Sequence, residues 1–162
     1  MSEKHEEKSI DNFNNDKWEP MPRPLVIDSG AAETVIPSEW FPLQDVQESQ
    51  GSKSGVYYTT ADGTPVYNEG EKTLMMSTLD GEHTRRMTFQ VAGVNKALGS
   101  VSKIVANGNR VIFDQNGSFI ENVWTKDKIW LREDNGVYVL DMVVAPPEEK
   151  VESGFTRPGM QR

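Results

Sequence analysis

Five Asx-Gly dipeptides occur in this chain, and four of them lie between two segments rich in β-branched or aromatic residues. Such pairs favour the tight turns of β-hairpins, because glycine adopts positive φ angles without steric cost. The four expected turns are Asp62-Gly63, Asp80-Gly81, Asn116-Gly117 and Asn135-Gly136. This density of hairpin turns is typical of a mainly β, antiparallel protein.

The segments beside these turns have the composition and alternation of β-strands. The Gln-, Ser- and Gly-rich stretch Gln44–Ser54 is expected to be a surface loop, and the prolines of Glu19–Pro24 should hold that segment extended. The expected hairpin arms are Val56–Thr60 with Thr64–Tyr67, Lys72–Leu79 with Arg85–Val91, Val111–Phe113 with Ser118–Glu121, and Ile129–Arg132 with Val137–Val143.

One short helix is expected among these strands. Ser100 is a suitable N-cap, and Val101, Ile104 and Val105 recur at helical spacing. Asn107-Gly108 is a suitable C-terminal stop.

A carboxylate stands between two apolar runs in the stretch Leu25–Pro37, LVIDSGAAETVIP. Strands are expected at Leu25–Ile27 and Thr34–Ile36, with a sharp turn between them. Burying Asp28 there costs free energy unless its carboxylate is hydrogen-bonded or used in chemistry. For the Asp-Ser-Gly triplet alone, the simpler interpretation is a turn in which Asp28 accepts backbone N–H groups and Gly30 supplies an unusual backbone angle.

The charge balance excludes several partners. The chain has 25 acidic and 17 basic residues, a net charge of −8, which argues against nucleic acid and anionic membranes. Much of the acid lies in residues 1–20 and 145–162, which lack apolar periodicity. We expect both segments to be disordered tails.

The chain has no cysteine and two histidines, His5 in the expected tail and His83 in an expected turn. We therefore expect no metal site and no cofactor. The absence of cysteine suits a reducing compartment, and the charged N-terminus lacks the apolar core of a signal peptide. The apolar run Val137–Ala145 is interrupted by Asp141 and is too short to cross a bilayer. These features predict an intracellular, cytoplasmic protein.

Several conspicuous side chains receive structural interpretations. Arg85-Arg86 is expected at an exposed strand start, and Met75, Met76 and Met87 are expected to pack. The large aromatic residues are expected in the core or on sheet faces rather than as a base-stacking platform, since the basic groove that such a platform needs is missing; they are Trp40, Phe89, Phe113, Phe119, Trp124 and Trp130.

Leu25–Ile36 resembles the active-site segment of retroviral-type aspartic proteases, the retropepsins: LVIDSGA is followed by Glu33, Thr34, Val35 and Ile36. A flap-like hairpin around Ala61-Asp62-Gly63-Thr64 comes next, in the family's order. FQVAGVNKALGSVSKIV then resembles the family's second half, with Leu98-Gly99 in the place of its second motif. Beyond it, LGSVSKIVANGNRVIFDQNGSFI and NGVYVLD are similar to the protease-to-integrase stretch of copia-type retrotransposon polyproteins.

This resemblance implies a retropepsin-like closed β-barrel or sheet fold with one short helix. The protease core would span residues 21–113, and a C-terminal β-hairpin extension would span 114–144. The resemblance implies that Asp28, Ser29 and Gly30 are catalytic, and that the substrate is a peptide or polyprotein. The implied substrate-binding residues are Ala31, Glu33, Ala61, Asp62, Gly63 and Thr64, and the second structural motif is Leu98 with Gly99.

The chemistry of the family explains why one motif is not enough. Peptide hydrolysis without a metal or a nucleophilic side chain needs an activated water and an acid–base pair. Two carboxylates held close together cannot both ionise, so they share a proton. This chain carries a single Asp-Ser-Gly. A working site would need Asp28 from each of two chains, so the resemblance implies a homodimer with Tyr57–Tyr67 as each flap.

The chain departs from many viral family members at two positions, which carry Ala32 in place of an acidic residue and Ser100 in place of an arginine. Losing both partners removes an ion pair without leaving an unpaired charge. We therefore expect a dimer held by other contacts, including C-terminal strands such as Val137–Val144. Glu33 keeps an acidic group that binds peptide or is simply solvated.

Three interpretations follow from the sequence. The first is an aspartic endopeptidase that processes a retrotransposon polyprotein. The second is a catalytically silent domain of the same fold that serves as a dimerisation or peptide-binding module. The third is a β-barrel of unrelated function.

Overall fold

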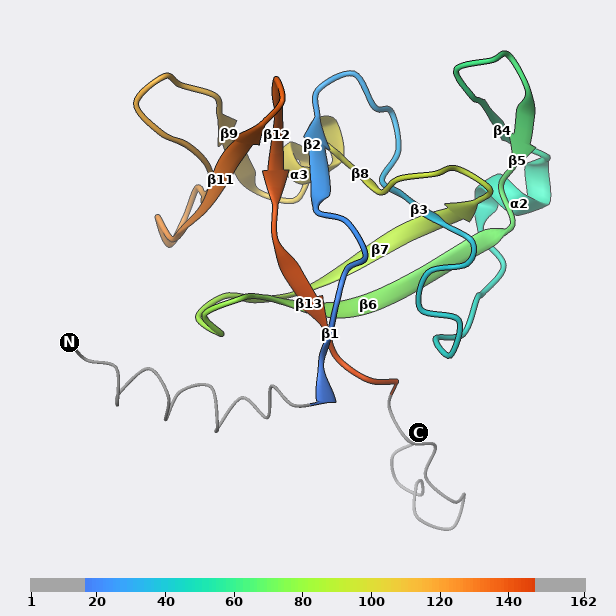
Figure 1. Cartoon of the computed structure of the whole chain (residues 1–162), viewed down its shortest axis with the longest axis horizontal. Coiled ribbons are helices and arrows are strands. Elements are labelled where there is room, and N and C mark those ends of the chain that lie inside the picture. Colours follow the sequence, from blue (N-terminus) through green and yellow to red (C-terminus); the bar gives the residue numbers. More distant parts are fainter. Residues whose placement is uncertain (1–16, 148–162) are drawn as a thin grey trace, which may run out of the picture.

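The computed structural model describes residues 17–147, and the expected tail segments 1–16 and 148–162, with His5, lie outside the described residues. The described part is mainly β, as predicted: an 11-stranded mixed sheet curls into a half-barrel, and a two-stranded hairpin stands apart from it (Figure 1). In spatial order the large sheet contains β1 (Glu19–Pro20), β13 (Met142–Val144), β6 (Gly70–Thr78), β7 (Thr84–Ala92), β3 (Val35–Pro37), β8 (Leu98–Ser100), β2 (Leu25–Asp28), β12 (Val137–Leu140), β11 (Lys128–Asp134), β10 (Ser118–Asn122) and β9 (Asn109–Ile112). The small sheet pairs β4 (Tyr57–Thr59) with β5 (Pro65–Tyr67), and the two described helices are α2 (Gln50–Ser54) and α3 (Val101–Ala106).

The large sheet is curled but not closed, so the expectation of a closed barrel is wrong. Strands β1 and β9 form its two edges. The sheet stays open because these two edge strands do not pair with each other.

All four expected hairpins form at the Asx-Gly pairs. Asn135 and Gly136 both have positive φ, 52° and 86°, as a type I′ turn requires. Gly63, Gly81 and Gly117 have positive φ as well. The local signals therefore located the antiparallel hairpins correctly.

The core lies inside the curl of the sheet. Strand β6 alternates as expected, with Leu74 and Met76 turned inward and buried. In β2 Leu25 and Ile27 are buried, whereas Val26 is half-buried. Phe89 is fully buried beside them, and Trp40 is also in the core, whereas Trp124 and Trp130 are exposed.

Lys72 is a buried cation that the sequence patterns did not predict. Its side chain is 1% exposed, and its Nζ donates hydrogen bonds of 2.8 Å to the carbonyls of both Trp40 and Phe41. Phe41 turns its backbone through a positive φ of 54° at this point. Burial lowers the pKa of Lys72, and the nearby charge of Glu69 acts in the opposite direction.

The expectation of a loop over the whole of Gln44–Ser54 is wrong, because residues 50–54 form α2. Ser49 and Ser52 form a reciprocal capping box at its start, and Gly55 ends it with a φ of 74°. None of the residues of α2 is buried, so the helix has no apolar face that a periodicity argument could detect.

The segment expected as a C-terminal extension is part of the same sheet. β12 pairs with both β2 and β11, and β13 pairs with both β1 and β6. Both edges of these strands are paired within the chain, so any contact of Val137–Val144 with a partner subunit would have to use side chains rather than backbone pairing. The sheet also reaches further at both ends than predicted: Glu19 lies opposite Val144, and Ala145 donates its N–H to Met75.

Within residues 17–147, both helices are too short to provide an apolar span across a membrane.

Candidate functional site

Asp28 ends strand β2, and its side chain is held by the turn that follows. The Gly30 N–H donates to Asp28 Oδ1 at 2.8 Å, and the Ala31 N–H approaches the Asp28 carbonyl at 3.4 Å. The residue is half-buried, at the end of the buried strand that begins at Leu25. The carboxylate is thus oriented by its own loop and remains accessible.

Gly30 is exposed, and the expectation that it supplies an unusual backbone angle is wrong. It is absent from the described glycines with positive φ. A Cβ atom at this position would meet only Asp28 Oδ1, at 3.4 Å, which is an ordinary contact. Within the described chain, neither backbone conformation nor packing requires glycine here. The neighbouring Ser29 is also exposed and makes no hydrogen bond with the described residues.

The second motif lies directly beside the first. Strand β8 runs parallel to β2, with Leu98 opposite Val26, Gly99 opposite Ile27 and Ser100 opposite Asp28. Gly99 is buried, and a Cβ atom there would approach Ile27 Cδ1 to 3.2 Å. The close packing of β8 on β2 therefore favours glycine at position 99.

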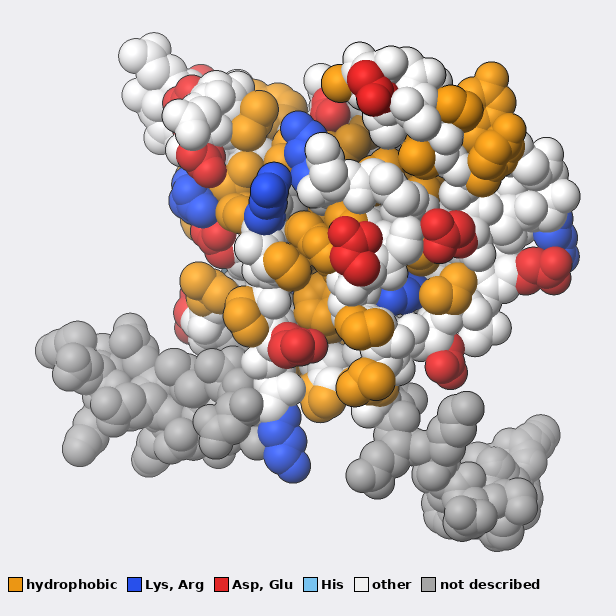
Figure 2. Space-filling view, turned by 45° about the vertical axis from the view of Figure 1, so that its right-hand side comes forward, with side chains coloured by type: hydrophobic (Ala, Val, Ile, Leu, Met, Phe, Trp, Pro, Cys, Tyr) orange, Lys and Arg blue, Asp and Glu red, His pale blue; other side chains and the backbone are white. Residues whose placement is uncertain are grey.

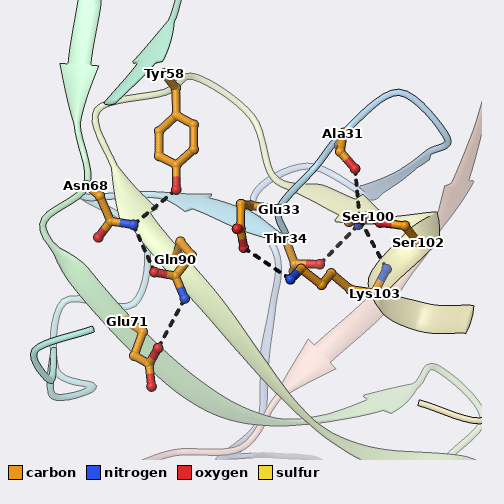
Figure 3. A network of polar contacts seen from close by, with 10 residues as sticks. All are labelled: Ala31, Glu33, Thr34, Tyr58, Asn68, Glu71, Gln90, Ser100, Ser102 and Lys103. Carbon is orange, nitrogen blue, oxygen red and sulfur yellow. Dashed lines mark hydrogen bonds and ion pairs between the residues drawn. The ribbon is translucent and has the colours of Figure 1, made fainter. Parts of the chain in front are cut away.

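Ser100 joins the Asp28 loop to helix α3. Its Oγ donates to the Ala31 carbonyl at 2.7 Å, and its N–H donates to Thr34 Oγ1 at 3.0 Å (Figure 3). The same Oγ accepts the Lys103 N–H at 3.3 Å as the N-cap of α3, which confirms the cap predicted from sequence. Ser100 is completely buried.

An ion pair forms next to the loop through a residue that the sequence reasoning did not single out. Lys103 Nζ lies 4.0 Å from Glu33 Oε1, and the two side chains point toward each other in Figure 3. Both are well exposed, so the pair contributes little to stability. Lys103 lies three residues after the expected N-cap Ser100, in the first turn of α3. This position in the predicted helix is the sequence signal that could have pointed to Lys103 as a neighbour of the Asp28 loop.

The β4–β5 hairpin carries the expected flap residues Ala61, Asp62, Gly63 and Thr64 at its turn. Asp62 Oδ1 accepts the Thr60 hydroxyl at 2.6 Å and the Thr64 N–H at 3.1 Å. These hydrogen bonds, first of all the one from Thr60, lower the pKa of Asp62 from 3.8 to about 2. The tip of the hairpin is a locally rigid turn that projects into solvent.

A polar network anchors the base of this hairpin to the large sheet. Asn68 Nδ2 donates to Tyr58 Oη at 3.0 Å and to Gln90 Oε1 at 2.8 Å, and Gln90 Nε2 donates to Glu71 Oε1 at 3.1 Å (Figure 3). Burial raises the pKa of Tyr58, the hydrogen bond from Asn68 opposes that rise, and the charge of Glu33 adds to it. The hairpin base therefore lies within electrostatic reach of the Asp28 loop.

The hairpin exposes an apolar surface. Tyr57 and Tyr67 pack with ring centroids 5.5 Å apart and are 56% and 59% exposed, and hydrophobic side chains gather at the upper right of Figure 2, where this hairpin lies. In the described part of the chain no hydrogen bond or ion pair joins the hairpin turn, residues 61–64, to the Asp28 loop. The structure thus brings Asp28, Ser29, Gly30 and Ala31 together with Leu98 and Gly99, and leaves the flap turn apart.

The residues 17–147 contain no group of three or more His, Asp or Glu side chains arranged to hold a metal ion. What the site offers is a single carboxylate, oriented by its own loop, at the end of a buried strand.

No family model, curated protein or solved structure matches the chain.

Proposed function

We propose that this chain is one half of a retropepsin-like aspartic endopeptidase that acts as a homodimer, with processing of a copia-type retrotransposon polyprotein in the cytoplasm as its role. The proposal rests on the resemblance of the sequence and on the geometry around Asp28. The order of strand, Asp-Ser-Gly loop, flap hairpin, second glycine motif and helix is the order that the family resemblance implies.

One observation carries the proposal furthest: Gly30 has no structural reason to be glycine within one chain. Its φ is ordinary, and a methyl group would fit beside Asp28. A glycine next to an oriented, accessible carboxylate is explained when the backbone of a second molecule, or a substrate, has to come close. Asp28 from each of two chains would then meet on a two-fold axis.

In the proposed mechanism the two Asp28 carboxylates share one proton. The ionised carboxylate takes a proton from water while the water oxygen attacks the peptide carbonyl carbon. The protonated carboxyl gives its proton to the carbonyl oxygen, forming a tetrahedral gem-diol. Collapse of this intermediate breaks the C–N bond: the protonated carboxyl gives its proton to the leaving amine nitrogen, and the ionised carboxylate takes the proton of one gem-diol hydroxyl. The pair then again shares one proton.

The β4–β5 hairpin would close over an extended peptide and exclude water from the reacting bond. Its exposed Tyr57 and Tyr67 supply apolar surface for substrate side chains. The network at Asn68 would keep the hairpin base fixed while the turn at Asp62 and Gly63 moves as a unit.

Cleavage of an unfolded polypeptide tests this proposal, with wild type compared with Asp28→Asn and with Asp80→Asn as a matched control in the β6–β7 turn. The proposal expects cleavage by wild type and by the control, with a loss of at least about a thousandfold in Asp28→Asn. Equal rates in all three proteins would refute it. A folded dimer that cleaves nothing between acidic and neutral pH would instead support the silent dimerisation or peptide-binding module.

A further inference from the structure

The first part of strand β7 presents a free edge inside the half-barrel. One edge of β7 pairs with β6 from Thr84 to Val91. The opposite edge pairs with β3 only over Gln90–Ala92, so no strand lies beside the residues before Gln90 on that edge. The Gln90 N–H points to the β3 side, because it donates to the Thr34 carbonyl at 2.8 Å. Backbone groups in a strand point to the same side at every second residue, so the N–H and C=O of Thr88 and Arg86 point to the free edge.

These backbone groups have no partner within residues 17–147. Arg86 and Thr88 take part in the β6–β7 pairing as residues opposite Met75 and Thr73, and no other backbone hydrogen bond involves them. A strand edge with unpaired groups at a two-residue spacing is a template for one more strand.

A groove runs along this edge, between β7 and helix α3. It consists of two adjoining hollows, of about 320 and 460 Å³, that share Arg86, Met87, Ile104 and Asn107 in their walls. Thr88 and Lys103 line the smaller hollow, and Ile120 and Ile129 lie in the floor of the larger one. We call this feature the β7-edge groove.

The two faces of β7 give the groove an alternating character. Met87 lies opposite the buried Leu74 on the inner, apolar face. Arg86 lies opposite Met75 on the outer face, where its guanidinium makes no hydrogen bond or ion pair with the other described residues. A strand added here would place alternate side chains against Met87 and the apolar floor, and the others beside Arg86.

The charges around the groove favour carboxylates on that second set of side chains. Arg85, Arg86 and Lys103 line its walls with Glu33 and Asp127, and Glu33 is already paired with Lys103. The local surplus of positive charge contrasts with the net charge of −8 for the whole chain.

We propose that the β7-edge groove binds an extended protein segment in which apolar and acidic residues alternate, by adding it as a strand to β7. The segment donates and accepts backbone hydrogen bonds at Arg86 and Thr88, packs its apolar side chains on Met87 and Ile104, and sets a carboxylate against Arg86. This site does not include Asp28, and its occupation does not depend on peptide cleavage.

A fluorescently labelled peptide in which Glu alternates with Val tests the proposal by its anisotropy with the full chain. Asp28→Asn should bind it as tightly as wild type does, which separates this site from the proposed active site. Arg86→Glu should weaken binding by at least about fivefold, while Arg23→Glu, the same charge change on an exposed residue outside the groove, should leave it unchanged. Equal weakening by both variants would mean general electrostatic attraction and would overturn the proposal.

Two isomeric peptides test the strand addition itself. One carries N-methyl groups on every Glu and the other on every Val, so each lacks N–H donors along one edge only. One isomer should lose at least about tenfold in affinity and the other should bind nearly as well as the parent peptide. Equal affinity of the two isomers would overturn the backbone pairing, whatever the result with Arg86→Glu.

Discussion

The Ser100 hydroxyl donates a 2.7 Å hydrogen bond to the carbonyl of Ala31, so the N-cap of α3 is tied directly to the loop that orients Asp28. Ser100 also lies opposite Asp28 in the parallel pair β2–β8. A single buried side chain thus connects the loop of the first motif, the strand of the second motif and the helix that follows.

Ser100→Ala should lower the free energy of unfolding by about 1–3 kcal/mol, because it removes a helix cap and leaves the Ala31 carbonyl without its donor. Urea denaturation measures the effect. Ser54→Ala, at the exposed end of α2, is the matched control and should change stability by less than about 0.5 kcal/mol. Equal losses in the two variants would show that Ser100 does not support the loop.

Gly30→Ala should separate folding from activity. The position has an ordinary φ and room for a methyl group, so stability should change by less than about 0.5 kcal/mol. Cleavage should nevertheless fall by at least about tenfold, because the methyl group lies where a second molecule has to approach Asp28. Thermal unfolding and peptide cleavage measured on one preparation check both parts, and full activity in the alanine variant would remove the argument from Gly30.

Lys72→Met should lower the free energy of unfolding by about 1–3 kcal/mol at neutral pH, because the Trp40 and Phe41 carbonyls lose their donor. The pKa of Lys72 is lower in the folded protein than its ordinary value of 10.5. Between those two pKa values the unfolded chain binds more protons, so this group makes stability rise with pH, up to about 10.5. Urea denaturation from pH 8 upward should show this slope in wild type and not in Lys72→Met, and parallel curves would contradict it.

The turn of the β4–β5 hairpin should respond to pH only in strong acid. The pKa of Asp62 is lowered to about 2 by hydrogen bonds from Thr60 and Thr64, so its stabilisation of the turn is complete above the unfolded value of 3.8 and is lost as pH falls through about 2. NMR titration of the carboxyl carbon should show this midpoint. Thr60→Val should move it up toward 3.8, and the neighbouring Thr59→Val should not; a midpoint unmoved by Thr60→Val would contradict the assigned cause.

Local signals predicted much of the fold. The Asx-Gly pairs placed the hairpins, a run of three apolar residues placed β2, alternation placed the buried face of β6, and the Ser100 cap placed α3. The same reasoning placed Asp28 at the end of a strand and Leu98-Gly99 in a second motif, and the structure puts the two motifs side by side. Each of these features depends on neighbours in sequence.

The features that the sequence did not predict depend on distant contacts or lack an apolar pattern. Pairing of β12 with β2 and of β13 with β6 joins segments more than sixty residues apart, and no local pattern specifies it. Lys72 can be buried only because Phe41 turns two carbonyls toward it. Helix α2 is polar throughout, so its capping serines were its one signal.

The central claim is that Asp28 is half of an active site, and subunit mixing tests it most directly. Wild type and Asp28→Asn are mixed at a fixed total concentration above that of dimer dissociation, left to exchange, and assayed for cleavage of an unfolded polypeptide. If both Asp28 side chains are required, an equal mixture retains about a quarter of the wild-type rate, because random pairing makes about a quarter of the dimers wild type. A rate of about half, proportional to the wild-type fraction, would mean that each chain acts alone and would contradict the account.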